Sequence, residues 1–231
     1  MKRYAIYFAP PRGSALWSFG NSWLGRDVET GEELRRPAII GLEDVDIDEL
    51  TSSPSLYGFH ATIKPPFRLS NPFDLGDLVK SLEEFAAARK SFECSLAGPS
   101  EIGNFIAFVL DCASTEMDRL ASEAVEFFDL YRSPLTDEEL RKRRSVSLTS
   151  RQEENLQNWG YPYVKEDFRF HMTLTNAVKT VALRSRLKEA LSDAAQTAGV
   201  IGPTEISGLA LYEQPGLGMP FKLLRRFPFQ N

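Results

Sequence analysis

The sequence predicts an α+β protein made of two similar lobes, each with antiparallel sheet and helices, in a pseudo-two-fold arrangement around a central cleft. Two segments, 57–67 and 168–175, alternate between apolar and polar residues, as half-buried strands do. Each is followed by the same order of elements, a helix and then two strands, over 57–111 and 168–228. This recurring order predicts an architectural duplication.

The N-terminal part begins with a strand over 4–9 that a Pro-Pro pair ends. Residues 13–25 are rich in aromatic side chains and are predicted to form a short helix. Residues 25–48 have the composition of a loop, with a turn at 29–31. The first alternating strand follows, and we expect it to stop at the Pro-Pro pair 65–66.

Apolar residues at helical spacing predict an amphipathic helix over about 73–89. Two strands are expected at about 91–97 and 103–111, with Gly98-Pro99 in the turn between them. A second helix is expected over about 115–131. These elements complete the first of the two units.

Residues 132–166 differ from the rest of the chain because they are rich in arginine and carry two helix-capping patterns. The segment ends in the aromatic stretch 159–163. We interpret it as a helical insertion near the site, between lobe one (about 1–131) and lobe two (about 167–231). The whole chain is then a single bilobal domain.

In lobe two a helix is expected over about 180–198, closed by Gly199, and two strands at about 204–213 and 220–228. A turn at 215–218 joins the last two strands. Pseudo-two-fold symmetry would place the two alternating strands side by side at the centre of the protein.

The composition is that of a soluble globular protein, with 42% hydrophobic and 26% charged residues. The net charge of −5 provides no overall positive field for nucleic acid. Cys94 and Cys112 lack the spacing of metal ligands and suit a reducing compartment. The apolar run at the N-terminus is too short for a signal peptide or a membrane span, so we expect a cytoplasmic protein without a membrane partner.

Both histidines of the chain stand in the same short pattern, His60-Ala-Thr62 and His171-Met-Thr173. Side chains two apart on a strand share a face, so each strand presents an imidazole and a hydroxyl together. A single histidine on a strand is most often structural. The duplicated pattern, with the same elements downstream, favours a functional role.

Two imidazoles facing one cleft can act as an acid–base pair, because the reference pKa of histidine is about 6.5. A threonine hydroxyl can donate a hydrogen bond to an anionic oxygen, and a phosphodiester has two non-bridging oxygens. The pattern therefore predicts that His60, Thr62, His171 and Thr173 surround one phosphate, with no metal or other cofactor required. It does not distinguish the general base from the general acid.

Four further residues are candidate substrate contacts. Lys64 and Arg169 lie at even spacing from the histidines and are predicted to share their face, unless they simply form a solvated strand edge. Tyr7 is a candidate wall for a sugar or base, against ordinary packing. Tyr161 either contacts substrate or anchors the insertion. The basic run 141–144 either is the solvated face of a helix or grips a second phosphate or an RNA strand.

The two His-x-Thr motifs resemble those of the two-histidine phosphoesterase superfamily, which includes cyclic nucleotide phosphodiesterases and RNA-end ligase-like enzymes. The stretches 58–67, 159–163 and 168–173 look like one bacterial branch, described as phosphonate-metabolism accessory proteins. The resemblance spans nearly the whole chain. It implies hydrolysis or formation of cyclic phosphodiesters without a metal, but it does not supply a substrate.

We therefore expect a metal-independent cyclic phosphodiesterase that acts on a nucleotide or sugar cyclic phosphate, with phosphonate utilisation as the implied setting. Its partner would be a small-molecule phosphodiester or an RNA end, and water is the expected nucleophile. One alternative is a metal-dependent hydrolase, which would need a carboxylate beside the histidines, and 50–73 contains none. The other is a phosphate- or RNA-binding module without turnover. The oligomeric state is left open.

Overall fold

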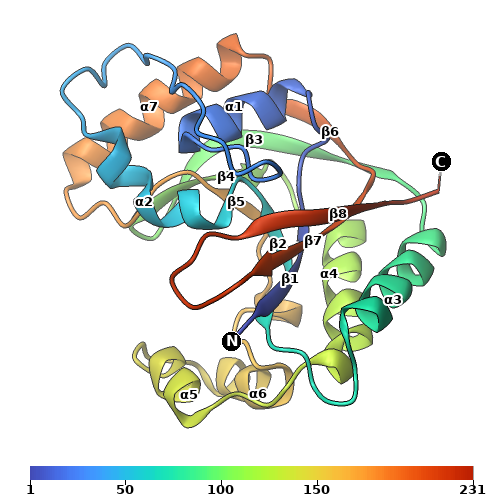
Figure 1. The fold of residues 1–231 in the computed structure, drawn as a ribbon. Coiled ribbons are helices and arrows are strands. Elements are labelled where there is room, and N and C mark those ends of the chain that lie inside the picture. The colour runs from blue at the N-terminus through green and yellow to red at the C-terminus, as the bar shows by residue number, and fades with distance from the viewer. Residues whose placement is uncertain (231) are drawn as a thin grey trace.

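A computed structural model of the protein, which describes residues 1–230, contains one eight-stranded sheet with helices around it (Figure 1). The strand order is β6-β3-β4-β5-β2-β1-β7-β8, and all neighbouring strands are antiparallel. The predicted α+β class with antiparallel sheet is therefore confirmed. The strands are β1 (Arg3–Phe8), β2 (Ala61–Phe67), β3 (Phe92–Ile102), β4 (Phe105–Leu110), β5 (His171–Thr173), β6 (Gly202–Ile206), β7 (Gly208–Gln214) and β8 (Lys222–Pro228).

Seven α-helices are found in the described part of the chain, six of them where a helix was predicted. They are α1 (Ala15–Leu24), α2 (Ile47–Tyr57), α3 (Leu75–Ala87), α4 (Thr115–Phe127), α5 (Asp137–Arg143), α6 (Ser150–Trp159) and α7 (Val181–Thr197). Helix α2 was not predicted. Figure 1 shows α5 and α6, the helices of the insertion, together at one end of the molecule.

The two central strands are β2 and β5, as pseudo-two-fold symmetry predicts. The spatial halves on either side of them are β2-β1-β7-β8 and β5-β4-β3-β6. Each half thus combines strands from the start and from the end of the chain. The proposed division into a lobe of residues 1–131 and a lobe of residues 167–231 does not match these halves, because the repeated order along the chain does not reveal which strands pair.

The main hydrophobic core lies between one face of the sheet and the helices α1, α3, α4 and α7. Helix α7 packs on β3 and β4, α4 on β2, and α3 on β8. The apolar stripe of each helix supplies this core because residues three or four apart share one helix face. Fully buried members include Ile6, Trp23, Leu82, Phe108, Leu187 and Leu191.

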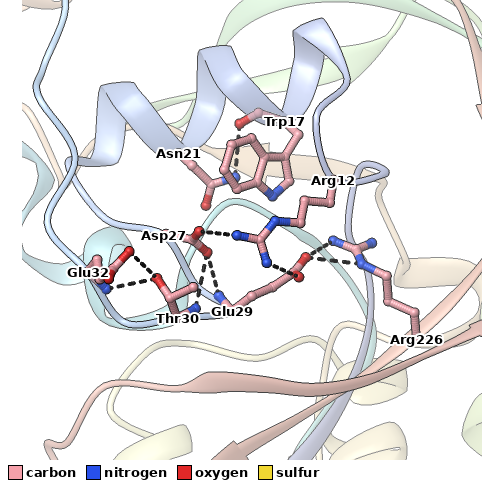
Figure 2. Close-up of polar contacts among 8 residues, drawn as sticks. All are labelled: Arg12, Trp17, Asn21, Asp27, Glu29, Thr30, Glu32 and Arg226. Atoms are coloured by element: carbon pink, nitrogen blue, oxygen red, sulfur yellow. Dashed lines mark hydrogen bonds and ion pairs between the residues drawn. The ribbon is translucent and has the colours of Figure 1, made fainter.

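A smaller apolar cluster occupies the opposite face of β1 and β7, where Tyr7 and Tyr212 pack with Phe221. The loop 25–34 contributes Val28 to this cluster. Polar contacts hold the loop there (Figure 2), because the Glu29 carboxylate lies between two guanidinium groups. These belong to Arg12, at 3.2 Å, and to Arg226, at 2.6 Å.

The predicted turn at 29–31 is also present in this loop. Asp27 forms it, since its carboxylate accepts the backbone N–H groups of Glu29 and Thr30 and its carbonyl accepts that of Gly31. The same carboxylate pairs with Arg12. Asp27 thus shapes the turn, while the ion pair of Glu29 with Arg226 joins the loop to β8.

The first histidine strand begins later than predicted. Residues 47–57 are helical, with Asp46 as the N-cap, so Tyr57 ends α2 instead of starting a strand. Gly58 then turns the chain with φ 77°, a conformation that favours glycine. A Cβ at Gly58 would also lie 2.5 Å from Val28. The alternation of residues 57–60 therefore reflects a tight turn rather than a strand.

The same strand continues past the Pro-Pro pair that was predicted to end it. Strand β5 contains only three residues, so β2 has no hydrogen-bonded neighbour on that side beyond Thr62. Pro65 and Pro66, which have no backbone N–H to donate, therefore do not interrupt a hydrogen-bonded pairing with β5. Strand β3 also runs through the predicted turn at Gly98-Pro99, where a register shift between residues 96 and 98 accommodates the glycine.

The predicted strand 204–213 is in fact two strands in opposite halves of the sheet. Strand β6 pairs with β3, whereas β7 pairs with β1 and β8. The chain passes from one to the other at Ser207-Gly208. A Cβ at residue 208 would lie 2.5 Å from the carbonyl oxygen of Phe227, so this crossing requires a glycine.

Lys64 does not share the face of the histidines, which corrects the prediction from even spacing. Ile6 pairs with Lys64 but Tyr7 pairs with Thr62, so β2 has one extra residue at this point. The bulge turns Lys64 into the core, where its side chain is 2% exposed. Its ammonium donates to the carbonyl of Val125 at 2.9 Å and to Asp129 at 3.3 Å.

We predict that Lys64→Met lowers the free energy of unfolding by about 1–3 kcal/mol, because a buried carbonyl and a carboxylate lose their donor. Asp129 keeps its ion pair with Arg132, which limits the loss. Urea unfolding measures it, with Lys80→Met on the exposed face of α3 as the control. Equal stability of the two variants would contradict the structural role of Lys64.

Candidate active site

The two His-x-Thr motifs meet across the central pair of strands. Ala61 of β2 lies opposite Met172 of β5 in antiparallel register. One residue further on each side, His60 therefore lies opposite Thr173, and Thr62 opposite His171. Diagonal neighbours in such a pair are about 7–8 Å apart, so the two imidazoles can flank one small group.

The strand periodicity separates this site from the core. Ala61 and Met172 are fully buried in the main hydrophobic cluster together with Phe8 and Phe108 of the flanking strands. The histidines and threonines beside them point to the other face and are only partly buried. Packing on one face thus fixes the spacing of the polar groups on the other.

Each imidazole is held by the backbone carbonyl two residues before it. Nδ1 of His60 lies 2.9 Å from the Gly58 carbonyl, and Nδ1 of His171 lies 2.8 Å from the Arg169 carbonyl. A carbonyl only accepts, so Nδ1 carries the proton in both rings. Both Nε2 atoms of the neutral rings are therefore proton acceptors.

The two rings have different neighbours. His60 stacks on Tyr7, with ring centroids 3.7 Å apart and planes at 16°. Its Nε2 lies 3.3 Å from the Thr62 hydroxyl, which can donate to it. His171 has the Phe105 ring at 5.9 Å. His60 is thus the more tightly packed of the two imidazoles.

Burial keeps both histidines neutral at pH 7. Burial, opposed by the Gly58 carbonyl bond and aided by the nearby His171, lowers the pKa of His60 to about 4. Burial also lowers the pKa of His171, while its bond to the Arg169 carbonyl opposes this. The electrostatic effect of His171 on His60 agrees with their diagonal placement. An anion between the rings would raise both pKa values.

The sequence matches the model of the DUF1045 family, described as a protein of unknown function, over residues 62–222. The chain belongs to the DUF1045 family. The match includes Thr62 and the complete second motif. It gives no activity for the family.

Two curated relatives of this DUF1045 protein carry the name ribose 1,5-bisphosphate phosphokinase PhnN. The protein from Janthinobacterium sp. (strain Marseille) is 38% identical over 235 residues, which cover 100% of this chain and 51% of the relative. The protein from Laribacter hongkongensis (strain HLHK9) is 33% identical, over 96% of this chain and 51% of the relative. The chain spans about half the length of the curated relatives it matches.

Solved structures with a similar course of the chain include TT0787 of Thermus thermophilus, with a TM-score of 0.47 and 14% identity over 99% of this chain and 98% of that one. Usb1 of Kluyveromyces marxianus has a TM-score of 0.44 and 12% identity, over 96% and 98% of the two chains. Neither similarity bears on the chemistry of the site.

The other predicted contacts lie outside the four-residue centre of this DUF1045 protein. Tyr7 is 1% exposed and supports His60, so it does not form the open wall that was expected. Lys64 points into the core. Arg169 brings its carbonyl to His171, whereas its side chain is exposed. Tyr161 belongs to the insertion, and the Arg143 guanidinium packs over its ring at 4.5 Å.

Sequence reasoning missed several groups beside the site. Tyr57 stacks on Phe221, with centroids 5.3 Å apart, and Phe221 lies 6.3 Å from Tyr7. The Arg3 guanidinium lies 5.9 Å from the Phe221 ring. The even spacing of Arg3 and Tyr7 in β1 was an available signal for Arg3. Nothing in the sequence indicates that Phe221, far along the chain, reaches this place.

Across residues 1–230, no group of three or more His, Cys, Asp or Glu side chains is arranged to hold a metal ion. None of the helices in this range has the length and apolar character that a membrane span requires.

We predict that the stability of the protein depends on pH through His60. The folded protein holds this ring neutral down to about pH 4, whereas the unfolded chain protonates it near pH 6.5. The unfolded state therefore binds more protons between these values. The His60 contribution is fully present above pH 6.5 and is lost as the pH falls towards 4.

Urea unfolding of wild type and His60→Gln at pH 7 and pH 4.5 measures this effect. The loss of stability on acidification should be smaller in the variant, because glutamine does not titrate. Equal losses in both proteins would show that the folded His60 pKa is close to that of the unfolded chain.

Proposed function

We propose that this chain is a metal-independent cyclic phosphodiesterase that acts on a nucleotide or sugar cyclic phosphate. The observation that supports it best is the pair of carbonyl-held imidazoles, each with an unprotonated Nε2, on adjacent antiparallel strands. Each imidazole has a threonine of the other motif opposite it. Such a site offers two proton-transfer groups and two hydroxyl donors to one phosphate.

His60 is the proposed general base because its pKa, lowered to about 4, keeps the ring neutral. Its Nε2 accepts a proton from water as the water oxygen attacks phosphorus. The phosphorus–oxygen bond to one ring oxygen then breaks. His171, whose pKa is raised by the bound anion, donates a proton from Nε2 to that leaving oxygen. The product is a phosphomonoester beside a free hydroxyl.

Thr62 and Thr173 are the proposed donors to the two non-bridging oxygens. Charge grows on these oxygens as the fifth bond to phosphorus forms, so donors fixed by the sheet stabilise the transition state more than the ground state. Thr62 is bound to His60 Nε2 in the free protein. It would exchange that partner for the phosphate.

The names of the relatives support a ribose phosphate as the first substrate class to test. Ribose 1,5-bisphosphate is the compound in both names, although those proteins are about twice as long as the matched region. No glycine in the present sequence precedes a lysine, so the common Gly-Lys-Ser/Thr phosphate loop does not occur in it. We therefore propose hydrolysis of a cyclic ribose phosphate, in phosphonate utilisation, and no kinase step here.

A screen of cyclic phosphates tests the proposal directly. It should include nucleoside 2′,3′-cyclic phosphates and ribose cyclic phosphates, each with and without a chelator. We expect turnover that the chelator does not change. Turnover lost with chelator would favour a metal-dependent hydrolase, and binding without turnover of any member would favour a binding module.

We predict that His60→Ala and His171→Ala each lower kcat by about 10²–10⁴ while the protein stays folded. A substrate whose leaving oxygen is replaced by sulfur needs little protonation of the leaving group. It should therefore restore much of the rate of His171→Ala but not of His60→Ala. Rescue of His60→Ala alone would reverse the assignment of acid and base, and wild-type kcat in either variant would contradict the paired mechanism.

We predict that Thr62→Val and Thr173→Val lower kcat/KM by an amount equivalent to about 2.7–4 kcal/mol, as for other lost oxyanion donors. Valine keeps the shape and strand preference of threonine, so the melting temperature should change little. Thr204→Val on the edge strand β6 is a matched control. Full activity of both site variants would remove the hydroxyls from the mechanism.

A further inference from the structure

Three arginines of the described chain are partly buried and make no ion pair with a carboxylate. They are Arg3, Arg26 and Arg143. Removing a guanidinium from water without a counter-charge is unfavourable. Most other arginines of the protein have a carboxylate within ion-pair distance.

All three lie around the aromatic pair of Tyr57 and Phe221. Arg26 donates to the Phe221 carbonyl at 2.7 Å, and Arg3 lies 5.9 Å from the Phe221 ring. Arg143 interacts electrostatically with Tyr57 and with Arg3. Because Phe221 also contacts Tyr7, which stacks on His60, this aromatic pair links the arginines to the candidate active site.

Their hydrogen bonds distinguish the three. Arg26 also donates to the Ser55 carbonyl at 3.2 Å, so two carbonyls engage it. Arg3 directs two N–H groups to a single oxygen of Gln214. Within residues 1–230, the Arg143 guanidinium has no hydrogen-bond or ion-pair partner, and its Cζ lies over the Tyr161 ring, 4.5 Å from the centroid.

The carboxylate that could neutralise Arg143 is engaged elsewhere. Glu139, one turn earlier in α5, accepts from Arg68 at 3.0 Å and from the backbone of Thr136 at 2.8 Å. Burial lowers the pKa of Arg143, Tyr161 and Glu139 oppose this, and the like charge of Arg3 adds a smaller lowering. Within residues 1–230, neither Arg143 nor Arg3 has a carboxylate at ion-pair distance, so a bound anion would supply the counter-charge that both guanidinium groups lack.

We propose that Arg143 and Arg3 form a second anion subsite, which binds a phosphomonoester on the same sugar whose cyclic diester lies between the histidines. The proposal rests on the proposed function and deepens it. Guanidinium groups suit this role because their N–H groups form charge-assisted, bidentate bonds to phosphate oxygens. Tyr57 and Tyr161 provide the aromatic walls beside them.

The subsite gives the inserted segment 132–166 a role. Arg143 is the last residue of α5, and Tyr161 follows α6. Arg3 and Tyr57, in contrast, belong to β1 and α2. The site for the second phosphate is therefore shared between the sheet and the insertion, so that the insertion selects substrates that carry two phosphate groups.

A binding experiment tests the subsite without any need for turnover. In the double variant His60→Ala/His171→Ala, an NMR titration with ribose 5-phosphate and with ribose reports the phosphomonoester alone. We expect ribose 5-phosphate to bind more tightly than ribose, and Arg143→Gln to weaken its binding about tenfold or more. Arg141→Gln, an exposed neighbour on the same helix, should leave the binding unchanged.

Kinetics provide the second test. Adenosine 2′,3′-cyclic phosphate and its 5′-phosphorylated form differ only in the second phosphate. Arg143→Gln should raise KM about tenfold for the phosphorylated form and hardly at all for the other, with similar kcat. Arg143→Lys keeps the positive charge but loses the bidentate N–H donors. Its KM for the phosphorylated form should therefore lie between those of wild type and Arg143→Gln.

The outcomes separate the two proposals. If ribose 5-phosphate binds through Arg143 but no cyclic phosphate is hydrolysed by wild type, the subsite holds and the proposed reaction is wrong. If Arg143→Gln, shown to be folded by its thermal unfolding, binds ribose 5-phosphate as well as the parent does, the subsite is wrong. An equal loss of ribose 5-phosphate affinity in Arg141→Gln would also overturn the subsite, because the effect would then come from the overall positive charge and not from Arg143.

Discussion

The candidate site depends on the antiparallel pairing of β2 with β5, centred on Ala61 and Met172. These two side chains are buried among core residues from both flanking strands. Because neighbours along a strand point to opposite faces, burying this pair leaves the histidine and threonine of each motif on the other face. The position of four polar side chains is therefore fixed by apolar packing behind them, and the short β5 needs only three residues to do this.

A second constraint acts on the imidazoles themselves. The Gly58 and Arg169 carbonyls hold the Nδ1 protons, so that ring orientation and tautomer are set before any ligand arrives. Burial works against charging either ring. Both imidazoles are thus neutral in the free protein. A bound anion would supply the counter-charge that a protonated imidazole needs. Arg3, Arg26 and Arg143 are likewise partly buried cationic groups without a carboxylate partner, so a bound anion would stabilise them.

The sequence was informative wherever local pattern decides structure. Apolar periodicity predicted α3, α4 and α7, helix-capping patterns predicted α5 and α6, and aromatic content predicted α1. The duplicated His-x-Thr pattern predicted that β2 and β5 are central neighbours. The sequence did not predict the features that depend on which strands pair and in what register. The bulge in β2 that turns Lys64 into the core depends on its register with β1, which alternation alone does not show. The approach of Phe221 to the site likewise depends on how distant segments pack, so it could not be predicted from its own neighbourhood.

The central claim is that the two imidazoles are held by their Nδ1 protons, with both Nε2 atoms unprotonated and available to one anion. Long-range proton–nitrogen correlation spectra test it most directly, because the protein has only two histidines. At pH 7 both rings should be neutral with the proton on Nδ1. Both Nε2 signals should shift together, with one apparent Kd, when inorganic phosphate is added. A proton on Nε2 in either free ring, or a response of only one ring to phosphate, would contradict the account.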